Sequence, residues 1–201
     1  SHHILVVVMV PRGEELILFS QEGMEARARL AGVEDKKALV EILEVYETPS
    51  RTTPLVLVQA LTRKPAWERI LRMATELGAT EIRGFVGERS VARGLHGPRW
   101  EKILLAAAAQ CGRSTPPALH THPNLPSAFA GLPETTRYIL TPGTQRKPAP
   151  STGAVLLIGP EGGLSPTELE AASSLGFEPA GLGQWTLRAD TATAAALSLY
   201  G

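Results

Sequence analysis

The sequence predicts an α/β protein in two parts, a small antiparallel β domain followed by a parallel sheet covered by helices. Up to Glu47 the chain has the pattern of short strands separated by turns, whereas after Pro54 apolar strands alternate with amphipathic helices. Such alternation is typical of a parallel sheet. The segment between them, residues 48–54, holds two prolines among small polar residues and is the best linker candidate. We therefore expect a β domain over residues 1–49 and an α/β domain over residues 50–201.

Four short strands are expected in the first domain. Apolar or alternating residues mark them at 4–10, 15–19, 24–30 and 37–45, and alternation of apolar and polar residues is typical of a strand with one buried face. A turn at Pro11–Gly13 separates the first two. A unit of this size buries little apolar surface, so we expect it to be weakly stable alone.

The second domain repeats strand and helix. Short apolar runs, of the kind that parallel sheets bury on both faces, predict strands at 55–61, 81–86, 138–141 and 154–158. Apolar residues at helical spacing predict helices at 65–77, 100–111, 166–175 and 191–199. Pro65 suits the first turn of its helix and Gly78 the end. Cys111 continues an apolar helix face, which predicts a buried thiol.

The composition excludes several classes of protein. The 201 residues include 20 Lys and Arg against 20 Asp and Glu, which excludes a polybasic coat protein and an acidic disordered tail. A single cysteine cannot form an intrachain disulfide, which favours a reducing compartment. No apolar run has the length of a bilayer, and His120 and His122 lack neighbouring ligands for a metal site. We therefore expect a cytoplasmic protein with neither a membrane nor a metal partner.

The loops after Thr141 and Ile158 are the expected ligand positions, because ligands of open α/β sheets collect at the carboxyl ends of the strands. Gly159–Gly163 holds three glycines, which let a backbone approach a ligand closely. A capped helix start follows at Ser165–Glu168. The spacing matches neither the phosphate loop of nucleotide hydrolases nor the dinucleotide-binding fingerprint, so we expect another kind of ligand loop rather than a plain connection.

The stretch Gly181–Ala192 is the second candidate. Asp190 suits the N-cap of the last helix. Arg188 precedes that helix without an obvious local partner and suits contact with an anion or a base.

Several phrases together resemble the RsmE family, SPOUT-superfamily methyltransferases that make 3-methyluridine in 16S ribosomal RNA. The most specific phrase is Gly159–Ser165, and the others that resemble the methyltransferase domain are at 74–79, 88–90, 99–100, 109–113, 182–183, 187–188 and 190–192. Residues 2–5, 13–15 and the strands up to Val45 resemble the family's PUA-like RNA-binding domain. The resemblance starts inside that domain, so we expect its N-terminal part to be missing or truncated.

The resemblance implies a SPOUT-type parallel sheet with a C-terminal trefoil knot, preceded by the small PUA-like antiparallel β domain. It further implies S-adenosylmethionine as cofactor, a homodimer, and 16S rRNA or the small ribosomal subunit as partner. The residues it assigns to cofactor binding are Leu140, Thr141, Pro142, Ile158, Gly159, Pro160, Glu161, Gly162, Gly163, Leu182, Gly183, Trp185, Thr186, Leu187, Thr191 and Ala192.

The implied reaction assigns three catalytic candidates. Uracil N3 must lose its proton to become a nucleophile, and Asp190 or Glu161 is available to accept it. Arg188 is expected to stabilise the negative charge that spreads onto the uracil carbonyl oxygens.

Two features depart from the family pattern. Trp185 and Thr186 replace the first pair of an Arg-Ile-Leu-Arg run, and Asp190 replaces a following Glu. Trp185 cannot make an arginine's contacts, although it can stack on a base. Residues 1–50 carry five basic against nine acidic residues, a net charge of −4, which is unusual for a surface that binds phosphates.

The positive charge lies further along the chain. Residues 63–113 carry ten basic against five acidic residues, which fits a solvated helical face or a surface that contacts RNA phosphates. The expected RNA contacts are Arg89, Arg93, Arg99 and Arg113. Two alternatives stand beside the uridine methyltransferase: a non-catalytic RNA- or ribosome-binding relative that kept the fold, and a methyltransferase that acts on a different RNA.

Overall fold

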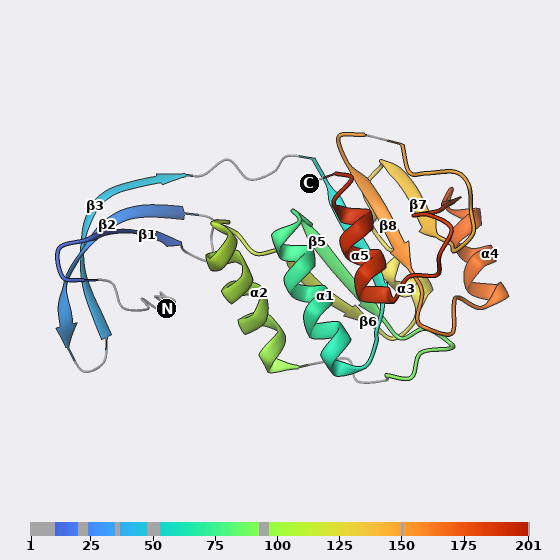
Figure 1. Cartoon of the computed structure of the whole chain (residues 1–201), viewed down its shortest axis with the longest axis horizontal. Helices are drawn as coiled ribbons and strands as arrows, with labels where there is room; N and C mark the ends of the chain where they lie inside the picture. The colour runs from blue at the N-terminus through green and yellow to red at the C-terminus, as the bar shows by residue number, and fades with distance from the viewer. Residues whose placement is uncertain are drawn as a thin grey trace. The chain divides into compact units, whose positions relative to one another are not determined.

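The computed structural model describes residues 11–19, 24–34, 37–47, 53–92, 97–149 and 151–200. Their contacts divide into two compact units (Figure 1). One holds the described part of residues 1–52 with residues 105–116, and the other holds residues 53–104 and 117–201. The domain boundary expected after residue 49 lies outside the described residues and stays a prediction.

The first unit contains a three-stranded antiparallel sheet in the order β1-β2-β3. Its strands are β1 (Glu15–Phe19), β2 (Met24–Glu34) and β3 (Lys37–Glu47), which confirms three of the four expected strands; the fourth, at 4–10, lies outside the described residues. Ala28 and Leu30 are buried on one face of β2. Arg27 and Arg29 alternate with them, as the period of two in a strand requires.

The second unit contains a six-stranded sheet with every pairing parallel, in the order β6-β5-β4-β8-β7-β9. The predicted strands are present as β4 (Leu55–Ala60), β5 (Glu81–Phe85), β7 (Thr136–Leu140) and β8 (Ala154–Ile158). The α/β class is therefore confirmed. The two edge strands, β6 (Ala118–His122) and β9 (Glu178–Ala180), are additional.

Helices connect these strands. They are α1 (Lys64–Glu76), α2 (Pro98–Cys111), α3 (Leu125–Ala128), α4 (Pro166–Ser174) and α5 (Ala189–Leu197). Gly78, with a φ of 84°, follows the end of α1 as expected. Cys111 is exposed at the end of α2, so the prediction of a buried thiol was wrong: the apolar face of the helix ends one turn earlier, at the buried Ala107 and Ala108.

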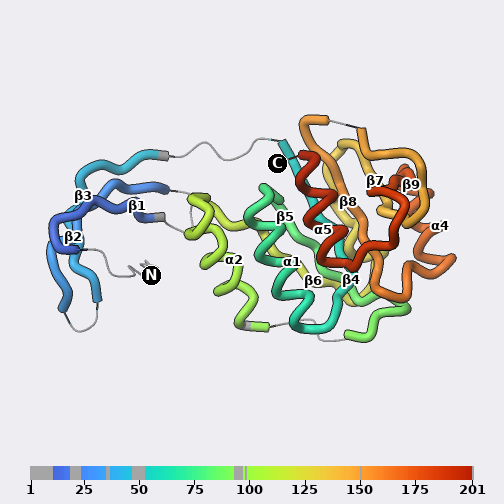
Figure 2. Tube along the Cα trace, in the orientation of Figure 1, coloured from blue at the N-terminus to red at the C-terminus, as the bar shows by residue number. Residues whose placement is uncertain are grey.

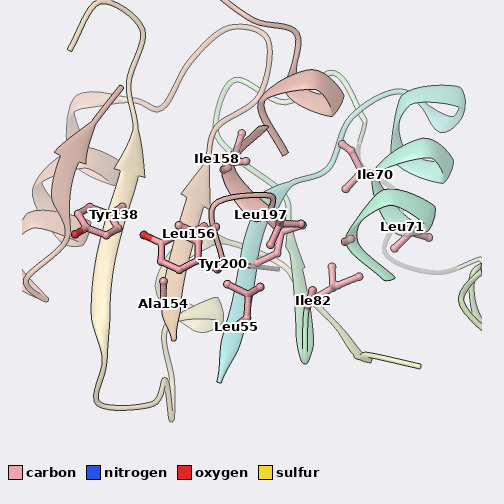
Figure 3. Packing of buried hydrophobic residues seen from close by; sticks show 14 of the residues in the cluster. Leu55, Ile70, Leu71, Ile82, Tyr138, Ala154, Leu156, Ile158, Leu197 and Tyr200 are labelled. Atoms are coloured by element: carbon pink, nitrogen blue, oxygen red, sulfur yellow. The ribbon is translucent and has the colours of Figure 1, made fainter. Parts of the chain in front are cut away.

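The core lies on both faces of the parallel sheet. Leu55 and Leu57 point to the face covered by α1 and α5, and Val56 and Val58 point to the face covered by α3 and α4. Figure 3 shows the first of these clusters, in which side chains from β4 and β8 meet those of α1 and α5. Burial of both faces explains why β8 is a continuous apolar run and why β4 is apolar except for the buried Gln59.

The chain after β9 passes close to the loop that follows β7 (Figure 2). The Gly181 N–H donates to the Arg146 carbonyl at 2.7 Å, and the Thr141 N–H donates to the Ala180 carbonyl at 2.8 Å. A Cβ on Gly181 would overlap the Thr144 carbonyl oxygen, so only glycine fits at this contact. The trefoil knot implied by the resemblance stays a prediction.

No helix among the described residues combines the length and apolarity needed to cross a membrane. The same part of the chain contains no cluster of three metal-ligating side chains.

Candidate functional site

A cavity of about 710 Å³ opens at the carboxyl ends of β4, β8, β7 and β9, within the size range of small-molecule sites. Four segments form its wall, each following one of these strands. The lining residues are Arg63, Pro65, Ala66, Arg69, Ile139, Leu140, Thr141, Pro142, Ile158, Gly159, Pro160, Glu161, Gly163, Leu164, Leu169, Leu182, Gly183, Trp185, Thr186, Leu187, Arg188, Ala189, Asp190 and Ala192.

This wall brings together most of the residues that the sequence singled out. All three catalytic candidates line it, as do all cofactor-binding candidates except Gly162 and Thr191. The residues not expected are Arg63, Pro65, Ala66, Arg69, Ile139, Leu164, Leu169 and Ala189. Several of these residues follow β4. Ligands of open α/β sheets bind at the carboxyl ends of neighbouring strands, so the pairing of β4 with β8 would have identified them.

The loop after β8 is tightly built. Gly163 has a φ of 70° and donates its N–H to the Pro160 carbonyl at 2.8 Å. A Cβ on Gly159 would lie 3.0 Å from Leu164 Cγ. Glycine at these positions therefore lets the loop turn within a few residues and present main chain to the cavity.

A capping box fixes where this loop ends. Ser165 Oγ accepts from the Glu168 N–H at 3.1 Å, and Glu168 Oε2 accepts from the Ser165 N–H at 2.8 Å. The other Glu168 oxygen accepts from the Glu88 N–H at 3.0 Å. The predicted capping box is thus confirmed, and its buried carboxylate also holds the segment after β5 against α4.

Asp190 does not cap α5. The N-cap is Arg188, and Asp190 lies in the first turn, where its carboxylate accepts from Arg69 Nε at 2.8 Å and Nη2 at 2.7 Å. The predicted N-cap was wrong because α5 begins at Ala189, which places Asp190 inside the first turn, and one of its carboxylate oxygens is bound by Arg69 of α1.

The pKa of Asp190 follows from the same contacts. Burial alone raises the pKa, but the hydrogen bonds from Arg69 and from the Thr191 N–H outweigh it, so the pKa of Asp190 lies below its ordinary value. The carboxylate is therefore ionised at neutral pH and is a weaker proton acceptor than a free aspartate.

The expected RNA contacts have other roles in part. Arg89 donates to the carbonyls of Gly162 and Leu164, each at 3.3 Å, which fastens the loop after β8. Arg99 forms an ion pair with Glu68 at 3.3 Å while its side chain remains largely exposed. Arg113 lies just after the end of α2, where its backbone N–H donates to the Ala108 carbonyl. Arg93 lies outside the described residues. Their contact with RNA stays a prediction.

Comparisons with known proteins agree with this picture. A family model described as an RNA methyltransferase domain matches residues 48–201. The ribosomal RNA small subunit methyltransferase E of Synechocystis sp. is 31% identical over 98% of this chain and 69% of that protein. The protein of the same name from Bacillus subtilis is 27% identical over 98% of this chain and 85% of that protein.

Solved structures give the same result. A methyltransferase of Legionella pneumophila, in complex with S-adenosylmethionine, has a TM-score of 0.83 at 29% identity and covers 99% of this chain and 87% of its own. The ribosomal RNA small subunit methyltransferase E of Neisseria gonorrhoeae, bound to S-adenosylmethionine, has a TM-score of 0.82 at 30% identity, covering 94% and 82%. The SpoU methyltransferase AviRb of Streptomyces viridochromogenes, at 16% identity and a TM-score of 0.51 over 81% and 68%, shares the fold.

Proposed function

Because the chain belongs to the ribosomal RNA small subunit methyltransferase E family, and is thus an S-adenosylmethionine-dependent rRNA methyltransferase, we propose that the cavity at Leu140–Ala192 holds the methyl donor and that the product is 3-methyluridine in 16S rRNA. The observation that carries this proposal is the convergence of the glycine loop after β8 and the segment before α5 on one cavity.

The cavity suits the donor in size and chemistry. Apolar side chains, among them Leu140, Ile158, Leu182 and Leu187, make up much of the wall and suit the flat adenine ring. The turns at Gly159–Gly163 and Gly183 present main chain, which suits recognition of the ring's polar edge. When it is bound, S-adenosylmethionine supplies an electrophilic methyl group on its sulfonium sulfur.

The chain's own residues then position the acceptor and move its proton. Glu161 lies on the cavity wall and is exposed, so it is the better candidate to accept the uracil N3 proton; Asp190 is already held by Arg69. Arg188 lies beside the same wall, where its guanidinium stabilises negative charge on a uracil carbonyl oxygen. Holding both reactants in one cavity provides the near-attack geometry that the displacement requires.

Arg188→Ala tests these roles. Loss of one group that stabilises charge in the transition state lowers kcat by about 100-fold or more, so methylation should be nearly abolished while calorimetry shows S-adenosylhomocysteine binding unchanged. Loss of both would mean that Arg188 is structural. Arg72→Ala is the matched control, since Arg72 is exposed on α1 and does not line the cavity.

The target is tested by incubating the full chain with small ribosomal subunits that lack the modification, followed by mass spectrometry of the nucleosides. A gain of 3-methyluridine supports the proposal. Another methylated nucleoside would indicate a different RNA position, and cofactor binding without transfer would favour the non-catalytic alternative.

We also propose that the enzyme is a homodimer and that Arg89, Arg93, Arg99 and Arg113 contribute to RNA binding, as the resemblance and the positive charge of residues 63–113 suggest. Light scattering on the purified chain tests the first point. The second predicts that RNA affinity falls steeply with added salt; a flat dependence would contradict it.

A further inference from the structure

Trp185 is the exception among the tryptophans of the chain. Trp67 is 1% exposed and packs edge-on against Trp100 with ring centroids 5.5 Å apart. Trp185 lines the cavity yet is 75% exposed. A large apolar ring left in water next to a binding cavity is typical of a surface that a ligand covers.

Free positive charge accompanies this ring. Arg63, Arg69 and Arg188 all line the cavity. The Arg69 guanidinium is engaged by Asp190, whereas within the described part of the chain the side chains of Arg63 and Arg188 form no hydrogen bond or ion pair, and both residues are exposed. One aromatic ring and two guanidiniums that are unpaired in the described part of the chain, those of Trp185, Arg63 and Arg188, therefore form an exposed rim of the cavity.

This combination fits single-stranded nucleic acid. Bases stack on exposed aromatic rings, and guanidiniums bind the phosphates alongside them. It also fits the reaction, because uracil N3 lies on the edge that pairs in a duplex, so the nucleotide must be unpaired and turned outward to be methylated. Stacking uses the face of the base and leaves that edge free to enter the cavity.

We propose that Trp185 is the stacking platform for the target base, and that Arg63 binds a phosphate flanking that nucleotide. The inference rests on the proposed function and specifies how its substrate is held. Trp185 is then a substrate-positioning residue rather than a wall of the cofactor site, although it stands in the segment that the sequence assigned to cofactor binding.

Tryptophan fluorescence tests the stacking directly. Since Trp67 and Trp100 pack against each other, the long-wavelength emission should come mainly from Trp185. A single-stranded oligouridylate should quench this emission in the wild type and not in Trp185→Phe. Quenching by S-adenosylhomocysteine alone, with none from the oligouridylate, would place Trp185 on the cofactor and overturn the proposal.

Affinity gives an independent measure. Trp185→Ala should weaken oligouridylate binding by about tenfold and raise KM for RNA with little change in kcat, because stacking acts on the bound substrate as well as on the transition state. Trp185→Phe should restore most of the affinity, which a merely structural role would not explain. Unchanged RNA affinity in Trp185→Ala would refute the stacking role.

Salt dependence tests the phosphate contact. Arg63→Gln should reduce the slope of log K against log salt by about 0.7, whereas Lys147→Gln, an exposed control outside the cavity, should not. Equal slopes for both variants would overturn the role of Arg63. Calorimetry with S-adenosylhomocysteine separates this outcome from failure of the proposed function, since a wild type that binds no S-adenosylhomocysteine refutes the cofactor site itself.

Discussion

The ion pair between Arg69 and Asp190 joins α1 to the segment that carries Arg188, and its removal should destabilise the protein measurably. Arg69→Met keeps the length of the side chain and removes its charge, and Asp190→Asn keeps the shape of the carboxyl group. Both partners line the cavity, and α1 packs against α5 in the core, so the pair connects the main core with the wall of the cavity.

The expected size follows from the exposure of the two side chains. Hydrogen bonds to charged groups contribute about 1.5–3 kcal/mol each to stability. The Arg69 side chain is 46% exposed and that of Asp190 12%, so solvent screening reduces this value. We expect each single variant to lose about 1–2 kcal/mol in the free energy of unfolding, and the coupling energy of the double-mutant cycle to be about 1 kcal/mol.

Denaturant unfolding at several pH values measures this. The pKa of Asp190 is lowered in the folded state, so the carboxylate's contribution is present above the unfolded value of about 4 and is lost as the pH falls through the folded value. The deficit of Asp190→Asn should therefore be full at neutral pH and shrink in acid. If the losses of the two single variants simply add in the double variant, or if the loss in Asp190→Asn persists in acid, the coupling is refuted. Arg72→Met is the control on the same helix.

Three further predictions concern the stability of the fold that holds the cavity. Gly181→Ala should lower the free energy of unfolding by about 2–3 kcal/mol, because the added methyl group overlaps a carbonyl of the loop after β7. Gly32→Ala is the control and should cost far less, since the space around Gly32 is open. Equal losses in the two variants would contradict the close contact at Gly181. Glu168→Ala should lower the free energy of unfolding by about 3 kcal/mol, because it leaves the buried Ser165 N–H and the partly buried Glu88 N–H without an acceptor. Ser165→Ala should lower it by about 1 kcal/mol; a larger loss in Ser165→Ala than in Glu168→Ala, measured by denaturant unfolding, would contradict this. Burial raises the pKa of Tyr200 to about 12. The contribution of the neutral phenol to stability is therefore fully present below about pH 10 and is lost as the pH rises towards the folded value. The free energy of unfolding of Tyr200→Phe should fall less over this range, and an absorbance titration that finds no tyrosine with a raised pKa would contradict this.

Much of the parallel sheet could be predicted because its central strands are buried on both faces. β8 is a continuous apolar run, and β4 is apolar except for Gln59, which is typical of strands covered on both faces. The edge strands carry no such signal: β6 contains His120 and His122 and is half-exposed, and β9 is three residues long with a proline in it. Neither pattern could be distinguished from a loop.

The site was predictable where local chemistry determines it. The capping box at Ser165–Glu168 and the turn at Gly163 need only neighbouring residues. The partner of Asp190 depends instead on Arg69, far away in sequence, and only the fold brings them together. An aspartate before an apolar helix therefore has the pattern of an N-cap, although its carboxylate serves α1.

The charges of the first sheet bear on where RNA is recognised. Arg27 lies within 4.0 Å of Glu15 and 3.3 Å of Glu44, and Arg29 lies 3.2 Å from Glu15 and 3.7 Å from Glu41. Three glutamates therefore surround two arginines, and a phosphate would have to displace them to bind there. The rim of the cavity has the opposite character, since Arg63 and Arg188 are unpaired in the part of the chain that the structure describes. Trp185, where the sequence departs from the family pattern, lines the same cavity. The cavity therefore offers the aromatic ring and the unpaired cations that the proposed contact with the target nucleotide uses, whereas Arg27 and Arg29 of the first sheet are already paired.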